Sequence, residues 1–364
     1  MDNKIVRYKT EERNGFYATL NQRVNIYFKA NKLSKKMNVF GLFKAILFSI
    51  LFLATYSFII LAEGSSVVLL SSFILLGFLQ ICLVLNLGHE GAHGSFSKNK
   101  VVNHLLTYTF DLVGTSGYIW KMKHVDSHHP NPMVLGVDVD HEQTEMFTFQ
   151  HLDDPPSIFK FQKIYAPILY CFYSLNVIFK ADWMDFFFRK SGNKIIRHSK
   201  VQVLLFVFFK LFYVTYILVL PLIFSGCSTL TVVCGFLLMH LVASLSAAVA
   251  LFPGHLYEDT AYAELNTNGE LESTWAEHQL QVTLDFGTQL PFLNFFFGGL
   301  NYHAIHHLFP TIAHVHLKKL RKIMIETAEE YHISYNHMPS LRKAIISHWK
   351  LLRKHGVNHL SEIL

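Results

Sequence analysis

Long apolar runs alternate with polar and charged segments along the chain. At roughly 1.5 Å per helical residue, four of these runs are long enough to cross a bilayer as helices, namely residues 39–61, 67–87, 203–224 and 230–252. They form two close pairs, and a very short turn joins the two members of each pair. The pattern predicts an all-α integral membrane protein whose four transmembrane helices form two hairpins.

The segments outside these runs are more polar. Residues 1–38 place apolar side chains at helical spacing among Lys and Arg, which predicts an amphipathic helix on the membrane surface. Residues 39–364 then form one membrane domain, in which segments 88–202 and 253–364 are long enough to build a cap outside the bilayer. Within segment 88–202, residues 158–179 are apolar. A fifth crossing there would put the basic residues that follow on the outer side of the membrane, against the positive-inside rule, so we interpret residues 158–179 as an interfacial or buried helix.

Composition and charge support this arrangement. Of the 364 residues, 51% are hydrophobic and 16% are charged, well below the charge content of an ordinary soluble domain. Lys and Arg lie before or at the start of the first run, between the two pairs and after the last run, and only Lys210, which we expect to snorkel, falls inside a later run. The positive-inside rule therefore places the N-terminus and both long segments on the cytoplasmic side. The net charge of +6 reports this orientation, and no motif favours nucleic-acid binding.

Histidines are the candidate chemistry of this chain, which contains 22 of them. Three clusters have spacings that share one helical face, and an even number of crossings separates them, so all three fall on the same side of the membrane. We expect them to converge on one metal site. The candidate ligands are His89, His93, His124, His128, His129, His303, His306 and His307.

Eight imidazoles exceed the three protein ligands of a catalytic zinc and suit two metal ions. Imidazole is compatible with several metals, so the ligand type does not name the ion. A site rich in neutral ligands at the membrane boundary is suited to the oxidation of a lipid chain by dioxygen, which favours iron. One cluster, HEGAH at 89–93, also fits the H-E-x-x-H motif of a zinc protease in which Glu90 is the general base.

The three clusters and their flanks resemble the membrane fatty acid desaturases, in particular the front-end and acyl-CoA branch. The flanking stretches are NLGHEGAHGSFSKNKVVNHLL, GYIWKMKHVDSHHPNP and NYHAIHHLFPTIAHVH, and the resemblance runs from the first apolar run to about His316. It implies a non-haem diiron centre with nearly all-histidine ligation, O2 as co-substrate, a long acyl substrate and a cytoplasmic cap that holds the metals. It also implies a ninth ligand after the fourth helix. His255 in VALFPGHLYE matches that position, and His240 inside the last run is the rival candidate.

Two features depart from the front-end pattern. His303 stands where front-end members usually carry Gln, which leaves the position of the double bond open. The chain also lacks the H-P-G-G sequence of a fused cytochrome b5 domain, so we expect a separate electron donor such as ferredoxin or cytochrome b5 with a reductase. The acyl carrier, whether coenzyme A, a membrane lipid or acyl carrier protein, stays open.

Other functions remain as alternatives. The same scaffold supports an acyl hydroxylase or an acetylenase, and an intramembrane zinc protease using HEGAH is a more remote alternative. A metal transporter would need polar residues through the spans, and these are nearly absent. Candidates for supporting roles beside the ligands are Tyr118, Trp120, Asn301 and Tyr302, with Asp126, Asp138, Asp140 and Glu258 as acceptors for histidine N–H groups.

Overall fold

The computed structural model describes residues 6–140, 146–150, 152, 155–188, 190–191, 194–260 and 262–356. The chain divides into two compact units. Apart from residues at the extreme N-terminus, the first unit consists of Asn38–Lys121 and Leu169–Ala248. The second consists of Asn3–Met37, Met122–Ile168 and Val249–Leu364.

Four helical runs among the described residues are long and apolar enough to cross a membrane, as the sequence predicted: Val39–Ile60, Ser66–Ala92, Lys200–Phe224 and Thr229–Gly254. The first is helix α2 (Val39–Ile60), and the last contains α13 (Thr229–Leu251). The second runs through α3 (Ser66–Leu83), a π-helical turn η1 (Val84–Gly88) and α4 (His89–Ala92). The third runs through α11 (Lys200–Val214), η5 (Thr215–Val219) and α12 (Leu220–Phe224). The second run is longer than predicted, so the first histidine cluster begins inside it.

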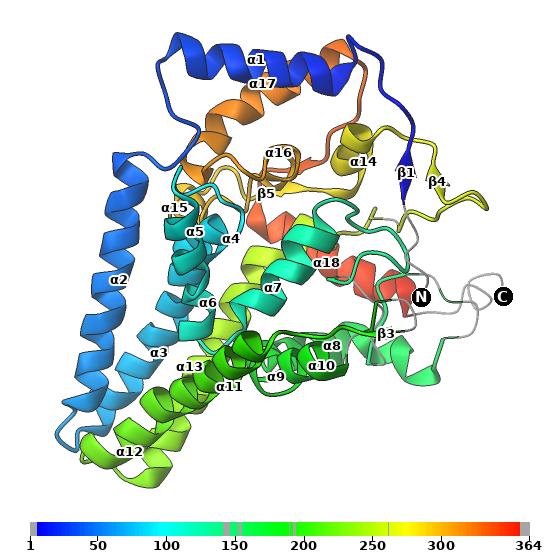
Figure 1. Ribbon diagram of the computed structural model, residues 1–364. Coiled ribbons are helices and arrows are strands. Elements are labelled where there is room, and N and C mark those ends of the chain that lie inside the picture. Colours follow the sequence, from blue (N-terminus) through cyan, green and yellow to red (C-terminus); the bar gives the residue numbers. More distant parts are fainter. Residues whose placement is uncertain are drawn as a thin grey trace. The chain divides into compact units, whose positions relative to one another are not determined.

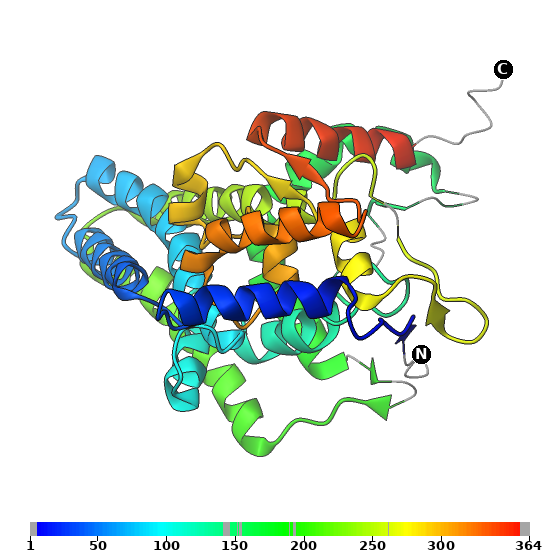
Figure 2. The same ribbon diagram turned by 90° about the horizontal axis from the view of Figure 1, so that it is seen from above.

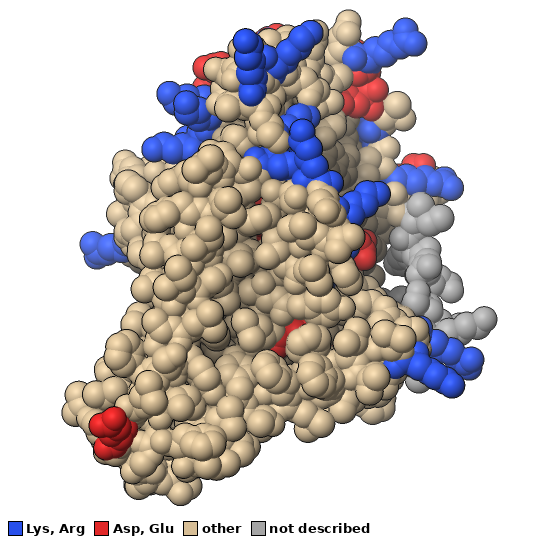
Figure 3. Space-filling model, turned by 60° about the vertical axis from the view of Figure 1, so that its left-hand side comes forward, with Lys and Arg blue, Asp and Glu red and all other residues tan. Residues whose placement is uncertain are grey.

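The turns within the two pairs of spans are close to each other. Gly64 and Gly226 both have positive φ angles, of 80° and 69°, which glycine adopts without steric cost. The N–H of Gly64 donates to the carbonyl oxygen of Ser225 at 2.9 Å. Asn38 and Ser65 accept backbone N–H groups at the starts of α2 and α3, as helix N-caps do. Charged side chains are sparse on the surface of these apolar helices (Figure 3).

Lys210 does not snorkel as the sequence suggested. Its ammonium group is buried in the first unit, where it donates to the carbonyl oxygens of Gly114 at 2.6 Å and Ile178 at 3.0 Å and pairs with Asp182 at 2.5 Å. Asp182 also accepts the N–H of Ser116 at 2.7 Å. The prediction was wrong because these partners satisfy the charge inside the protein.

Short elements complete the first unit. They are α5 (Lys100–Thr107), α6 (Thr109–Leu112), α7 (Gly117–Lys123), α9 (Tyr173–Asn176), η4 (Val177–Ala181), α10 (Asp182–Phe188) and the paired strands β2 (Lys190–Ser191) and β3 (Lys194–Ile195). The ambiguous apolar segment at 158–179 is not one straight helix. Ser157–Tyr170 and Tyr173–Phe188 form a pair that is bent by 78°. Its interfacial placement stays a prediction.

The second unit is built from short helices and strand pairs (Figure 1). Its helices are α1 (Phe16–Ala30), η2 (His124–His128), η3 (Ser157–Phe161), α8 (Gln162–Tyr170), η6 (Phe252–Gly254), α14 (Trp275–Val282), α15 (Pro291–Phe296), α16 (His303–Leu308), η7 (His314–His316), α17 (Leu317–Glu330) and α18 (Leu341–His355). Strand β1 (Arg7–Tyr8) pairs in parallel with β4 (Glu270–Leu271), and β5 (Asp285–Phe286) pairs in parallel with β6 (His337–Met338). Each of these strands has only two residues, and the described part of the chain is mostly helical, as predicted.

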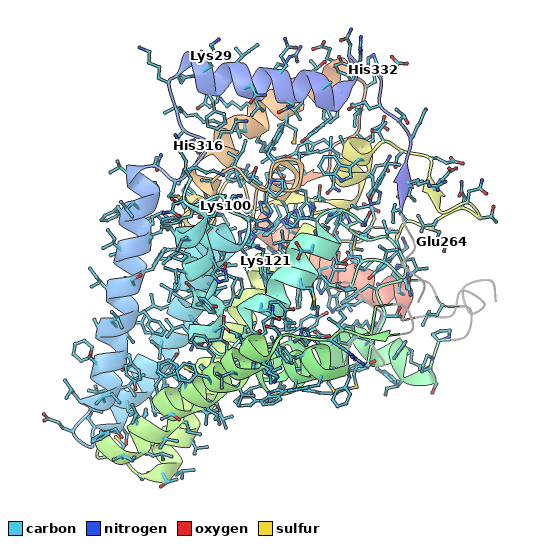
Figure 4. All side chains as sticks on the ribbon, viewed as in Figure 1. Lys29, Lys100, Lys121, Glu264, His316 and His332 are labelled. Carbon is cyan, nitrogen blue, oxygen red and sulfur yellow. The ribbon has the colours of Figure 1, made fainter. Side chains whose placement is uncertain are left out.

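Helix α1 lies along α17 in both ribbon views (Figures 1 and 2). Its apolar residues Phe16, Leu20, Val24 and Phe28 are buried in a core that includes residues of α14, α16 and α17. The helices are antiparallel, with Lys29 near the end of α1 and His332 just beyond the end of α17 at opposite ends of the pair (Figure 4). The amphipathic helix is therefore present, and its buried apolar residues pack against protein. The placement of this segment on the membrane surface stays a prediction.

Candidate metal centre

The second histidine cluster lies on a π-helical turn. The N–H of His129 bonds to the carbonyl oxygen of His124 at 3.0 Å, a spacing of five residues instead of the four of an α-helix. This wider turn brings His124 and His129 together, with their Nε2 atoms 3.2 Å apart, while His128 points into the same buried region. Single π turns of this kind are frequent at functional sites.

Three imidazoles converge on His255. Its Nε2 atom lies 3.1 Å from Nε2 of His128, 3.1 Å from Nε2 of His307 and 2.8 Å from Nε2 of His303. These side chains are buried, and they come from η2, from the residue after η6 and from α16. The second and third clusters and the predicted ninth histidine therefore meet in the second unit.

The hydrogen-bond acceptors that face Nδ1 determine the tautomers of His255 and His307. Nδ1 of His255 faces the carbonyl oxygen of Val282 at 2.9 Å, and Nδ1 of His307 faces Oε1 of Gln279 at 2.9 Å. Because both oxygens only accept, each Nδ1 carries the proton, and each neutral ring presents an unprotonated Nε2. Lone pairs that face one another at 3.1 Å repel, and a shared cation removes that repulsion. The arrangement fits a metal ion.

Two carboxylates hold the second cluster. Oδ2 of Asp138 lies 2.8 Å from Nδ1 of His128, and Oδ2 of Asp140 lies 3.0 Å from Nδ1 of His124. Asp138 is itself fixed because it accepts the N–H groups of Met133 at 2.8 Å and Asp140 at 3.0 Å. Metal-bound histidines are usually oriented by such acceptors. Both carboxylates were among the four candidate acceptors; of the others, Asp126 is exposed and Glu258 pairs with Lys350.

Burial favours the neutral form of two histidines of the third cluster, His306 and His307. Burial lowers the pKa of His307 well below its ordinary value, and the neighbouring rings of His303, His255 and His128 lower it further. The pKa of His306 is lowered in the same way by burial and by nearby imidazoles. Neutral imidazole is the form that binds a metal, so these side chains are available as ligands at physiological pH.

Helix α16, which carries the third cluster, is anchored by Asp285. This buried carboxylate accepts the N–H of Ala304 at 2.9 Å, the Nε–H of Arg321 at 2.9 Å and the hydroxyl of Tyr335 at 2.5 Å. Burial raises the pKa of Asp285, and the hydrogen bonds from Tyr335 and Ala304 and the charge of Arg321 oppose that rise. The sequence showed no sign of this anchor, because its members lie far apart in the chain.

A glycine allows His303 to approach. A Cβ atom at Gly254 would lie 2.6 Å from Cδ2 and 2.8 Å from Nε2 of His303. Real Cβ contacts are essentially never that short, so any larger residue would require the ring or the backbone to move. This role beside the metal site is not visible in the sequence, where Gly254 has the character of a turn residue.

The first cluster lies in the first unit. His89 and His93 are buried at the two ends of one helical turn, with ring centroids 4.6 Å apart. The ring of Trp120 lies 5.6 Å from that of His89, so Trp120 supports this cluster. Glu90 accepts the hydroxyl of Ser95 at 2.7 Å. The convergence of these two histidines with the other seven stays a prediction.

The remaining candidates are distributed between the units. His240 is buried in α13, where Nδ1 lies 2.9 Å from Oγ of Ser174 and Nε2 lies 3.1 Å from the hydroxyl of Tyr213. These contacts account for both ring nitrogens, which favours His255 over His240 as the ninth ligand. Tyr118 bonds to Nδ1 of His198 at 3.0 Å. Asn301 and Tyr302 are buried immediately before α16.

Gln279 on α14 contacts the second and third histidine clusters, a role that the sequence did not predict. Its Oε1 atom faces Nδ1 of His307, and its Nε2 donates to the carbonyl oxygen of His129 at 3.2 Å. It therefore links the second and third clusters. Its position in WAEHQLQV carries no motif, so only its three-dimensional position reveals this role.

Comparisons with known proteins agree with the site. The fatty acid desaturase family model matches residues 64–339. The sn-1 linoleoyl-lipid 6-desaturase of Arthrospira platensis is 29% identical over 348 residues, which cover 94% of this chain and 93% of that protein. The acyl-lipid (8-3)-desaturase B of Dictyostelium discoideum is 31% identical over 364 residues, covering 96% of this chain and 77% of that protein.

A further relative is the Delta(5) fatty acid desaturase A of Dictyostelium discoideum, which is 30% identical over 365 residues that cover 96% of this chain and 76% of that protein. The family match includes the HEGAH stretch, so the zinc-protease alternative has no support from these relatives. The chain belongs to the fatty acid desaturase family and is an oxidoreductase that desaturates fatty acids.

Proposed function

We propose that the chain is a membrane-bound diiron desaturase that inserts a double bond into the acyl chain of a membrane lipid. The observation that carries this proposal is the convergence of the Nε2 atoms of His128, His303 and His307 on Nε2 of His255. The proposed ligands are His89, His93, His124, His128, His129, His255, His303, His306 and His307.

The distances support metal binding. At a metal–nitrogen distance of about 2.0–2.1 Å, two imidazoles at right angles on one ion lie roughly 3 Å apart. The separations of 3.1 Å from His255 to His128 and to His307 agree with this value. Imidazole binds iron, zinc and copper, and the family's oxidative chemistry favours iron.

Several side chains and one carbonyl group position the proposed ligands. Two iron ions, when bound, would supply the oxidation of the acyl chain by dioxygen. Asp138, Asp140, Gln279 and the carbonyl oxygen of Val282 hold the protonated Nδ1 atoms outward and so keep each Nε2 directed inward. The two electrons come from a separate donor protein such as ferredoxin or cytochrome b5.

The topology is part of the proposal. Two helical hairpins cross the bilayer, and the Lys- and Arg-rich segments 88–202 and 253–364 form a cap on the cytoplasmic side. The electron donor then reaches the centre from the cytoplasm.

The substrate is inferred from the relatives. The proteins of Arthrospira platensis and Dictyostelium discoideum are named as linoleoyl-lipid and acyl-lipid desaturases. We therefore favour a lipid-linked acyl chain over acyl-CoA or acyl carrier protein. The names of the relatives point to carbons 5 and 6 as the first positions to examine.

Metal analysis and acyl profiling test the proposal together. Protein purified anaerobically in mild detergent is analysed for iron and zinc, and the lipids of the expressing cells are profiled for new double bonds. We expect about two irons per chain and a product that disappears in His307→Ala. The control is His332→Asn just beyond α17, where Asn tolerates the left-handed backbone with its φ of 54°. One zinc without iron, after an attempted reconstitution with iron, would contradict the diiron proposal.

A further inference from the structure

The second unit has an exposed apolar face outside the four spans. It is formed by two helical segments, η3 with the start of α8 (residues 157–168) and α18. Soluble surfaces rarely expose a contiguous apolar patch of this kind without an interaction partner. The partner is indicated by the residues of the face.

The first segment exposes one helical stripe. Ile158, Phe161, Ile164 and Ile168 recur at intervals of three or four residues and are 48% to 61% exposed. Phe159 and Gln162 on the opposite face are buried. The segment thus has one face buried in the protein and, on the other side, an apolar stripe that is about half exposed.

Helix α18 continues this exposed surface. Ile345, Ile346 and Trp349 are 41% to 44% exposed, and Trp349 follows the two adjacent isoleucines by four and three residues, whereas Leu351 and Leu352 are buried. The two segments pack on each other through polar contacts. The indole N–H of Trp349 donates to the carbonyl oxygen of Lys163 at 3.1 Å, and Nε2 of Gln162 donates to the carbonyl oxygen of Leu352 at 2.8 Å.

The charge on the two segments has a single sign. Residues 157–168 and 341–355 contain no Asp or Glu. Lys350 pairs with the carboxylate of Glu258 at 2.8 Å. Isoleucine, tryptophan and cations together are typical of helices in the headgroup region of a bilayer, where Trp sits at the boundary and Lys or Arg reach lipid phosphates. The cations of the two segments include Lys160, Lys163, Arg342, Lys343, Lys350 and Arg353.

We propose that the face formed by residues 157–168 and α18 lies in the interfacial layer of an anionic membrane, with Ile164, Ile346 and Trp349 among the acyl chains. A bilayer is the occupant that this face fits, because the chain already carries four candidate spans and because the cations complement anionic headgroups. This contact is a second membrane attachment, and it would restrain the unit that carries seven of the proposed ligands.

Fluorescence quenching of Trp349 tests the proposal. The full chain is reconstituted into vesicles of phosphatidylcholine and phosphatidylglycerol, with or without bromine in the upper part of the acyl chains. The difference between the wild type and Trp349→Phe isolates the emission of Trp349. We expect brominated lipid to quench at least half of that emission and aqueous iodide to quench little of it. The matched control is Trp275→Phe, since Trp275 packs on Tyr17 in the α1 core and is expected to be insensitive to brominated lipid.

A second variant keeps the test informative if Trp349→Phe misfolds. Ile164→Trp adds a reporter at a position that is 61% exposed on the other segment, and its added emission is expected to respond in the same way. Quenching by iodide alone at both positions would show a water-exposed face and overturn the proposal. Protection from both quenchers would overturn it as well, because it would show a protein partner or a second copy in place of lipid.

Discussion

Nδ1 of His128 lies 2.8 Å from Oδ2 of Asp138, and the two side chains are only 2% and 1% exposed. A buried carboxylate is costly unless its lone pairs are satisfied, and Asp138 meets this condition by also accepting backbone N–H groups from Met133 and Asp140. The carboxylate is thus held by the backbone, and it in turn holds the imidazole. These contacts together set the direction of Nε2 of His128.

Replacing Asp138 by Asn is therefore expected to weaken the metal site. The amide can still contact His128, but the substitution removes the negative charge. The amide can also turn its N–H toward Nδ1 of His128, which itself carries a proton. Loss of such a supporting contact typically lowers metal affinity by about 10–100-fold. Iron per chain, measured after dialysis against a graded series of chelator concentrations, is the readout. Asp126→Asn, at an exposed position in the same turn, is the matched control and is expected to retain iron.

Gly254→Ala is expected to displace the ring of His303. The added methyl group would lie within 2.6 Å of that ring, so either the ring or the backbone of η6 must move. Because His255 follows directly, both proposed ligands would be disturbed. We expect the variant to lose desaturation activity and bound iron, whereas its thermal unfolding midpoint changes only slightly. Retention of full activity would show that the ring of His303 has room to shift.

Glu90→Gln and His93→Ala are expected to behave differently. The amide introduced by Glu90→Gln would keep an oxygen acceptor for the hydroxyl of Ser95, which lies 2.7 Å from Oε2 of Glu90, so much of the activity is expected to remain. His93→Ala removes a proposed ligand and is expected to abolish desaturation. Product formation in cells, normalised to the amount of protein in the membrane fraction, compares the two. Complete loss in both variants would show that the carboxylate of Glu90 is itself essential for desaturation.

Lys210→Met is expected to destabilise the first unit. It leaves Asp182 as a buried carboxylate without its cation, and removing one partner of a buried ion pair costs about 3–5 kcal/mol. The double variant Lys210→Met with Asp182→Asn removes both charges and is expected to recover part of that loss. Thermal unfolding of the detergent-solubilised wild type, single variants and double variant measures the coupling. Equal unfolding temperatures for all of them would mean that the pair contributes no net stability.

The sequence predicted the four spans because a membrane imposes a length and an apolar composition that are visible along the chain. It also predicted the second and third clusters and His255, and the structure brings members of all three together in the second unit. Histidine spacing on a helix is a local property, so one sequence displays it. The prediction for Lys210 was wrong, because the outcome depended on which distant residues surrounded its ammonium group.

Only the tertiary structure decided which groups support the ligands. Gln279 reaches His307 from another helix, and Asp285 joins Ala304, Arg321 and Tyr335 across long sequence separations. A hydrogen bond to a histidine needs one acceptor at the correct distance and angle, and many residue types or a bare carbonyl oxygen, such as that of Val282, can provide it. The sequence therefore determined the candidate ligands and the membrane-spanning segments, whereas folding determined the tautomers and orientations that let the Nε2 atoms face one another.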